Sequence, residues 1–273
     1  MNVFDQMMSR YEILSENDRR NAIHEVMQEI TLAGLYRSGF FDKAAFYGGT
    51  CLRIFHSMPR FSEDLDFSLV AKVDVFNLED YFPAIVAEFK ALGRDVAITK
   101  KVKNISGNVE SAFLKDDTEI YDLAFQTERT IKVKIEVDTN PPLEFQTEQK
   151  LLLQPFSFMT RCFILPDMFA GKMHALLFRN WKTRVKGRDW YDFEWYVRNQ
   201  VPLDLNHLQV RTRQFNGIDL SKEEFIDKLK TRLSSTDIEL VKRDVAPFVK
   251  DENMLDIWSN DYFVQLAKML RFF

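Results

Sequence analysis

Alternating apolar and polar residues at 64–70 and 131–138 constrain the fold of this chain more than any other feature of its sequence. Successive side chains of a β-strand point to opposite faces, so each segment gathers apolar residues on one face and polar residues on the other. Strand-like runs also occupy residues 96–102, 109–114 and 119–126. The pattern predicts a twisted sheet in the first half of the chain.

Helical periodicity accounts for much of the remaining sequence. A helix is expected at 18–38, with Ser15 as its capping residue, and another at 79–92. Later in the chain only helical patterns follow, starting near Pro166, Asp189, Leu205, Ser221, Thr236 and Met254. We therefore expect an α/β (α+β) fold, with a mixed β-sheet flanked by helices at residues 1–155 and a helical C-terminal domain at 156–273.

Composition excludes several classes of protein. The chain has 273 residues, of which 46% are hydrophobic, and a net charge of −4. These values indicate a globular protein and exclude one that coats nucleic acid with its whole surface, although a local basic patch stays compatible. No apolar run approaches the roughly 20 residues of a membrane span, and the N-terminus lacks the apolar region of a signal peptide. With only Cys51 and Cys162 the chain suits a reducing compartment, so we expect a cytoplasmic protein without a membrane partner.

A glycine pair stands between the apolar run 44–47 and a short helix expected at 51–56. Gly48 and Gly49 allow the backbone to approach a ligand closely. Free amides at a helix start, together with the Thr50 hydroxyl, form an anion site suited to phosphate. A tight strand–turn–helix corner also requires glycine for geometry alone, so this motif by itself has two explanations.

Carboxylates follow the glycine pair on the strand at 64–70. Asp64 and Asp66 share one face of that strand and repel each other. A divalent cation between them removes this repulsion, and hard oxygen ligands suit Mg²⁺ that holds a triphosphate. A solvated strand face is the alternative explanation for the pair.

A third carboxylate comes from the strand at 131–138. Glu136 and Asp138 lie on its charged face, so their spacing leaves both open as the third metal ligand. Glu136 stands between Ile135 and Val137, which favours it. An amphipathic strand with an exposed charged face explains the same pattern without a metal.

Two helices in the second half carry further charged pairs. Lys172 and Arg179 are seven residues apart on a helix, so they share nearly one face and can neutralise a triphosphate. Asp189 and Asp192 are three apart on the next helix. Either aspartate can orient Lys172 or act as a base toward an acceptor hydroxyl. Acidic residues that stabilise a helix N-terminus are the alternative.

The segment between these helices is basic and aromatic. It contains Trp181, Lys182, Arg184, Lys186 and Arg188. Such a segment is able to contact an RNA backbone, and it is equally typical of a solvated loop.

These pieces, in this order, resemble the nucleotidyltransferase superfamily, whose pattern is a glycine turn, an acid–x–acid strand and a later single acid between apolar residues. The run Gly-Gly-Thr-Cys-Leu-Arg at 48–53, followed by Arg60-x-Ser62-x-Asp64-x-Asp66, is similar to the AbiEii/AbiGii-type nucleotidyltransferase toxins. So are Lys-Met-His-Ala-Leu at 172–176 and Arg-Asp-Trp-Tyr-Asp at 188–192. The resemblance covers residues 46–195.

The resemblance implies a nucleotidyltransferase-like sheet and transfer of a nucleoside monophosphate from an NTP to an acceptor hydroxyl, with Mg²⁺ or Mn²⁺. The implied nucleotide-binding residues are Gly48, Gly49, Thr50, Arg53, Arg60, Ser62 and Lys172. The implied catalytic residues are Asp64, Asp66, Lys172, Asp189 and Asp192. The implied metal ligands are Asp64, Asp66 and Glu136.

The resemblance also implies the toxin of a bacterial toxin–antitoxin or phage abortive-infection system. Its partners would be an NTP, an RNA acceptor such as a tRNA 3′ end, and a cognate antitoxin from a neighbouring gene. A metal-dependent nuclease and a non-catalytic nucleotide-binding protein are the rival hypotheses, and a protein acceptor stays open. The sequence leaves the base of the NTP and the oligomeric state undetermined.

Overall fold

The computed structural model describes residues 2–100, 118–125, 131–179 and 185–273. Within them, seven strands form one mixed sheet with the order β3-β4-β5-β2-β1-β7-β6. The strands are β1 (Ala44–Tyr47), β2 (Asp64–Leu69), β3 (Val96–Lys100), β4 (Thr118–Phe125), β5 (Lys132–Asp138), β6 (Thr147–Leu152) and β7 (Phe158–Phe163). β2 runs antiparallel to β1 and parallel to β5, which makes the sheet mixed as predicted.

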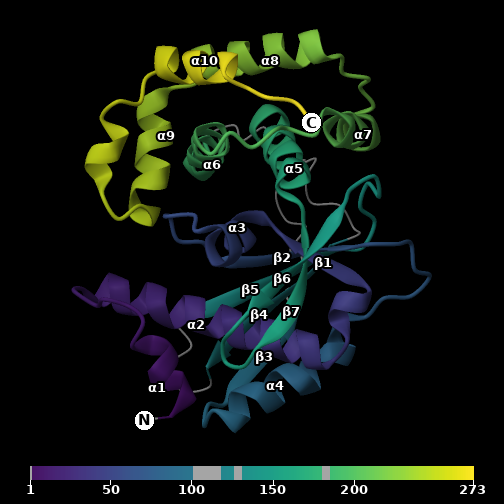
Figure 1. Ribbon diagram of the computed structural model, residues 1–273, viewed down its shortest axis with the longest axis vertical. Helices are drawn as coiled ribbons and strands as arrows, with labels where there is room; N and C mark the ends of the chain where they lie inside the picture. The colour runs from purple at the N-terminus through teal and green to yellow at the C-terminus, as the bar shows by residue number, and fades with distance from the viewer. Residues whose placement is uncertain (1, 101–117, 126–130, 180–184) are drawn as a thin grey trace.

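Helices lie on both sides of the sheet (Figure 1). In that view α1, α2 and α4 lie below it, while α3 and the helical C-terminal half lie above it. The helices before β3 are α1 (Val3–Met8), α2 (Glu16–Arg37), α3 (Gly48–His56) and α4 (Phe82–Ala91). The helices after β7 are α5 (Leu165–Phe178), α6 (Gly187–Arg198), α7 (Leu205–Asn216), α8 (Lys222–Ser235), α9 (Ile238–Val245) and α10 (Asn260–Lys268). The expected fold class is therefore confirmed.

Local signals explain most of these boundaries. The Ser15 side chain accepts a hydrogen bond from the Asp18 amide and caps α2, as its position in the sequence predicts. Ser221 and Glu224 form a reciprocal capping box at the start of α8. On β5, Val133 and Ile135 are fully buried between charged neighbours, so the period of two places one face of this strand in the core.

Three expectations differ from the structure. The helix expected from residue 51 begins at Gly48, so the glycine pair forms its first turn. The last expected helix is split, because the Trp258 ring donates to Glu194 (2.7 Å) and Ser259 caps a new helix. Strands β6 and β7 were missing from the sequence interpretation, although Phe158, Thr160 and Cys162 alternate with partly or fully exposed residues.

Three predictions are not tested by the structure. The strand expected at 109–114 and the candidate RNA-contact residues Trp181, Lys182 and Arg184 lie outside the described residues. β7 follows the predicted domain boundary at residue 155 and pairs with β1 and β6 in the same sheet, and the division into 1–155 and 156–273 stays a prediction. No helix in the described part of the chain is long and apolar enough to cross a membrane.

Candidate active site

Three adjacent strands place Tyr47, Asp66 and Glu136 in one row. Tyr47 at the end of β1 is the register partner of Asp66 in β2, and Asp66 is the register partner of Glu136 in β5. Asp64 lies two residues before Asp66 and therefore shares its face. Asp138 is instead opposite Ser68, one step further along the sheet. The register thus brings the predicted carboxylates together and sets Glu136, rather than Asp138, beside Asp66.

Negative charge is crowded at Asp66. Burial raises the pKa of its carboxyl, and the nearby Glu136 and Asp64 carboxylates raise it further, to about 7. Lys186 and Lys134 act in the opposite direction. An additional cation at this position would therefore stabilise the ionised form of Asp66.

The described residues contain no group of three or more His, Cys, Asp or Glu side chains arranged to hold a metal ion. Glu136 forms an ion pair with Lys134 in this structure. The assignment of Asp64, Asp66 and Glu136 as metal ligands stays a prediction. Their oxygen donors are nevertheless of the hard type that Mg²⁺ prefers.

The glycine pair is required by close packing. Gly48 has φ +81°, and a Cβ there would overlap the Asp66 carboxylate. A Cβ on Gly49 would lie 2.7 Å from Arg60 Nη2 and 2.8 Å from Ser62 Oγ. The two glycines therefore allow the first turn of α3 to pack directly against the carboxylate row and against Arg60 and Ser62.

Thr50 has a structural bond that the sequence did not reveal. Its side chain is fully buried, and its hydroxyl donates to the Asp64 carbonyl at 2.5 Å. This bond fixes α3 to β2 and uses the hydroxyl proton. The predicted contact of Thr50 with phosphate is thus restricted to its backbone amide, because a phosphate needs a donor and the hydroxyl proton is already used.

A buried ion-pair network faces the sheet from the helical half. Arg60 donates from Nε and Nη2 to Asp192, at 2.6 and 2.7 Å. Lys172 Nζ lies 2.8 Å from an oxygen of Asp192 and 2.8 Å from an oxygen of Asp189. Arg179 completes the network at 2.9 Å from the second oxygen of Asp189. We name these five residues the α5–α6 network.

The charges of this network stabilise one another. Burial alone would raise the pKa of Asp189, but the Lys172 and Arg179 cations outweigh it and hold that pKa below its usual range. The pKa of Asp192 is lowered in the same way, against burial, by Arg60 and Lys172. Burial lowers the pKa of Lys172, and the two aspartates more than compensate. Both aspartates therefore orient Lys172, and neither is a strong base at neutral pH.

Two arginines that were predicted to meet a triphosphate have protein partners. Arg60 is 2% exposed and is held by Asp192. Arg53 donates from Nε to Glu25 (2.8 Å), and its Nη1 donates to two backbone carbonyls at 3.0 Å. Either guanidinium would have to leave these partners before it could bind phosphate.

Sequence reasoning gave neither of two other cations a role toward the nucleotide. Lys186, considered only within the basic segment that is able to contact RNA, directly precedes α6 and lines a small hollow with Arg179 and Asp189. Arg211 lies on α7, in a region without any recognised motif. Only the packing of α7 on α5 brings it near the site, so no local signal could have identified it.

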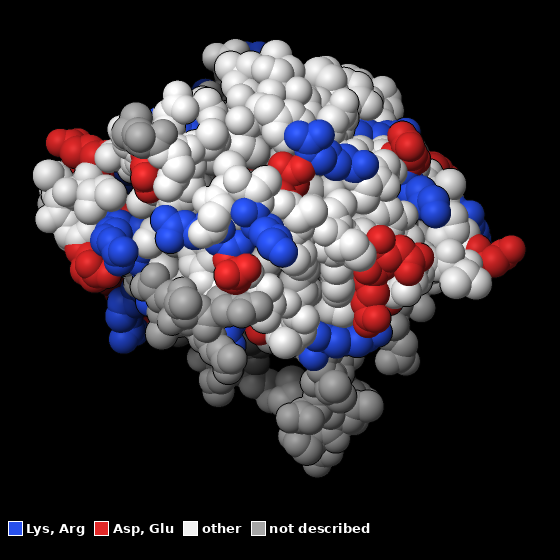
Figure 2. All heavy atoms as spheres, turned by 90° about the horizontal axis from the view of Figure 1, so that it is seen from below, with Lys and Arg blue, Asp and Glu red and all other residues white. Residues whose placement is uncertain are grey.

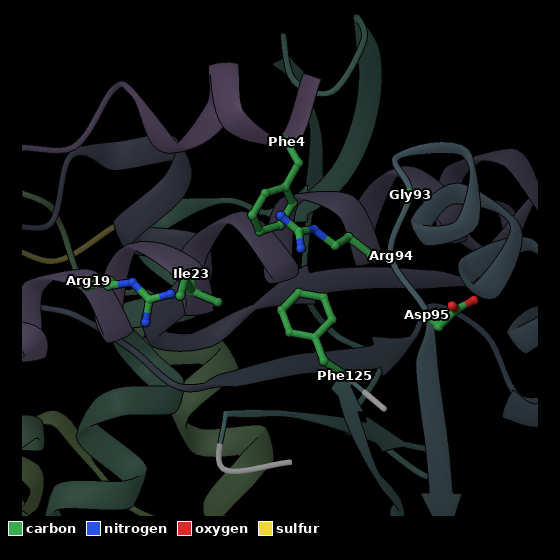
Figure 3. Close-up of a pocket in the computed structure, with 7 residues that line it drawn as sticks. All are labelled: Phe4, Arg19, Ile23, Gly93, Arg94, Asp95 and Phe125. Carbon is green, nitrogen blue, oxygen red and sulfur yellow. The ribbon is translucent and has the colours of Figure 1, made fainter. Parts of the chain in front are cut away.

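A larger cavity lies away from the carboxylate row. It has a volume of about 250 Å³ and opens beside α1 and the turn after α4 (Figure 3). The Arg94 guanidinium stacks over the Phe4 ring within it, 4.3 Å from the ring centroid. Its lining residues are Phe4, Arg19, Ile23, Gly93, Arg94, Asp95 and Phe125. None of the predicted site residues is among them.

The mixed sheet, the glycine turn and the acid–x–acid strand define a nucleotidyltransferase-type protein. The chain matches the family model described as nucleotidyl transferase AbiEii toxin, type IV toxin–antitoxin system, over residues 30–272. The chain belongs to this family and is a nucleotidyltransferase toxin of a toxin–antitoxin system. The predicted family and enzyme class are confirmed.

Solved structures share the fold. MenT4, a nucleotidyltransferase toxin from Mycobacterium tuberculosis, matches with a TM-score of 0.60 and 14% identity, over 97% of this chain and 98% of that chain. JHP933 from Helicobacter pylori matches with a TM-score of 0.53 and 18% identity, over 94% of this chain and 91% of that chain. At these identities the likeness concerns the fold alone. No curated protein sequence matches this chain significantly.

Proposed function

We propose that this toxin transfers a nucleoside monophosphate from an NTP to a hydroxyl of RNA, with a tRNA 3′ end as the acceptor. The observation that carries the proposal is the row of Asp66 and Glu136, with Asp64 on the same face, beside the glycine turn. Grouped carboxylates opposite buried cations suit a reaction in which a triphosphate is bound and pyrophosphate leaves.

Mg²⁺ or Mn²⁺ would be held by Asp64, Asp66 and Glu136. The raised pKa of Asp66 supports this assignment, since it reflects a negative crowding that a cation relieves. Glu136 would exchange its contact with Lys134 for the metal. When bound, such a metal supplies Lewis-acid activation of the triphosphate and the acceptor hydroxyl.

The protein's own residues position the reacting groups. Lys172 stays protonated between Asp189 and Asp192, so its charge is fixed in place before the substrate arrives. The acceptor hydroxyl gives its proton to water and its oxygen bonds to the α-phosphorus, while the bond from that phosphorus to pyrophosphate breaks and pyrophosphate leaves. Gly48 and Gly49 let the first turn of α3 pack against the carboxylate row, so its free backbone amides would face phosphates bound there.

The acceptor RNA would approach from the side of the helical half. On the opposite side, Figure 2 shows the face under α1, α2 and α4, where the described Lys and Arg residues are interspersed with Asp and Glu. A long polyanion binds best to a continuous basic surface, which the described part of this face does not present. We propose that the toxin acts in the cytoplasm and is countered by an antitoxin from a neighbouring gene.

The test incubates the purified protein with total RNA, Mg²⁺ and each α-³²P-labelled NTP in turn. Asp66→Asn is the inactive variant, and Asp74→Asn, an exposed aspartate in the loop after β2, is the matched control. We expect label in tRNA-sized RNA with the wild type and Asp74→Asn, and none with Asp66→Asn.

Other outcomes contradict the proposal in separate ways. Label on protein would move the acceptor to a polypeptide, and shortened RNA without label would support a nuclease. Tight NTP binding without any labelled product would support a non-catalytic nucleotide-binding protein.

A further inference from the structure

We propose that Arg211 on α7 and Lys186 before α6 bind the triphosphate of the incoming nucleotide. The inference rests on the proposed function. The sequence suggested Arg53 and Arg60 as contacts of the triphosphate, and the inference assigns that contact to Arg211 and Lys186 instead.

Four other cations near the carboxylate row already have anionic partners. Lys172 is held by two aspartates, and Arg60 by Asp192. Arg53 is paired with Glu25, and Lys134 with Glu136. A triphosphate would have to displace a carboxylate from each of them, which cancels much of the electrostatic gain.

Arg211 is different, because the described residues offer it no ion pair. Its Nε is buried and has no hydrogen-bond partner. Its guanidinium lies 5.2 Å from the Phe215 ring centroid, and its Cζ is 3.9 Å from the position of a Cβ on Gly171, the residue before Lys172. A buried guanidinium without a carboxylate is unfavourable until an anion arrives.

Two groups at the edge of the carboxylate row, Tyr47 and Asp138, act on the Arg211 guanidinium. Burial has the largest effect and lowers the pKa of its guanidinium, while the Tyr47 hydroxyl and the Asp138 carboxylate act to raise it. Tyr47 is the neighbour of Asp66 across the sheet, and Asp138 is two residues beyond Glu136. Arg211 therefore approaches the carboxylate row from the side of β1 and the end of β5.

Lys186 approaches the same row from α6. Burial lowers its pKa to about 8, and Asp189 opposes that effect. Lys186 lines a hollow with Arg179 and Asp189 of the α5–α6 network, and among the cations it lowers the pKa of Asp66 most. It has no ion pair with any residue that the structure describes, so its charge is available to a ligand.

The two cations thus flank the carboxylates, with the anionic groups on the sheet and the available cations on the helical half. A triphosphate would be held there by hydrogen bonds from Arg211 and Lys186 to its oxygens, while a metal on the carboxylates would neutralise further charge. The planar guanidinium suits two oxygens of one phosphate, and the ammonium serves as a point charge.

The experiment measures binding of inorganic tripolyphosphate and of each NTP by calorimetry, with Mg²⁺ and without RNA. The variants are Arg211→Gln, Arg211→Lys and Lys186→Gln. Arg213→Gln is the matched control, because Arg213 lies on the same helix and pairs with Asp219 on the surface.

We expect Arg211→Gln and Lys186→Gln each to weaken binding of both ligands roughly tenfold to a hundredfold, with Arg211→Lys in between. Binding by Arg213→Gln should equal that of the wild type. Without ligand, the melting temperature of Arg211→Gln should be unchanged or higher, since the cation it removes has no ion pair with any described residue. Arg211→Lys provides the comparison if the glutamine variant fails to fold.

Wild-type affinity for tripolyphosphate in both glutamine variants would overturn the inference. Failure of the proposed function is recognised separately: tripolyphosphate binding that depends on Arg211 and Lys186, without nucleotide transfer to any RNA, would leave this inference standing.

Discussion

Asp66 combines three constraints in one side chain. It lies against Gly48, it is the register partner of both Tyr47 and Glu136, and its pKa is raised to about 7. Because the folded-state pKa lies above the unfolded-state value, ionisation of Asp66 opposes folding as the pH rises toward 7. A carboxylate whose charge destabilises the free protein in this way is typical of a site where that charge binds a ligand.

Replacement of Asp64 or Asp66 by alanine should separate activity from stability. We expect nucleotide transfer to fall by roughly a hundredfold or more, because the metal loses a ligand. The melting temperature should stay the same or rise by about 2–4 °C, because one of two repelling charges is gone. Full activity in either variant would contradict the metal-site assignment; calorimetric melting provides the second readout.

Two buried histidines make the stability dependent on pH. Burial lowers the pKa of His174 to about 3 and that of His207 to about 4, from 6.5. Both folded-state values lie below the unfolded-state value, so the unfolded chain binds more protons between about pH 4 and 6.5. The free energy of unfolding should therefore fall as the pH decreases through this window.

We expect the step from pH 7 to pH 5 to lower the free energy of unfolding by roughly 2 kcal/mol for each of these histidines. His174→Gln retains a donor for Asn216, with which His174 Nε2 is in contact at 2.8 Å, and should show a smaller loss. Urea unfolding at both pH values measures the difference. Equal losses in the wild type and the variant would show that folding does not shift the pKa of His174.

At the scale of elements, the α5–α6 network joins parts of the chain that are distant in sequence. Arg60 in the segment before β2 and Asp192 in α6 are 132 residues apart, and both are almost completely buried. Their bidentate contact sets α6 over the start of β2. Lys172 then adds α5 to the same cluster.

Removal of one partner of this pair should destabilise the protein strongly. We expect Arg60→Met or Asp192→Leu to lower the free energy of unfolding by about 3–5 kcal/mol, because a buried charge is left alone. The double variant should recover part of the loss. The pair Arg213 and Asp219, 65% and 80% exposed, is the control and should contribute about 0–1 kcal/mol. Additive losses in a double-mutant cycle would contradict the coupling.

At the scale of the whole molecule, the two halves carry different spectroscopic probes. All four tryptophans, Trp181, Trp190, Trp195 and Trp258, belong to the helical half. β7 belongs to the sheet although it follows residue 155, and the Arg60–Asp192 contact crosses between the halves. The halves therefore share both a sheet and a buried ion pair.

We expect tryptophan fluorescence and circular dichroism in the strand region to give the same urea midpoint. Shared elements make partial unfolding of one half unfavourable for the other, so a single cooperative transition should result. Two separate midpoints would instead support independent domains at 1–155 and 156–273. Arg60→Met tests the coupling, since loss of the contact should move the two midpoints apart.

The sequence by itself determined the features that depend on local periodicity. The period of two identified β2 and β5 and their charged faces, and the cap at Ser15 located α2. The motif order around Gly48 and Asp66 was sufficient to indicate the family. These features follow from side-chain direction and backbone preference within a few residues, so they can be predicted from the sequence alone.

Only the tertiary structure decided which residues meet. Spacing left Glu136 and Asp138 open, and the register of β5 on β2 sets Glu136 beside Asp66. The packing of α7 on α5 brings Arg211 to the site from a segment without a motif. Register and helix packing depend on contacts between residues far apart in the chain, and local patterns carry no information about such contacts.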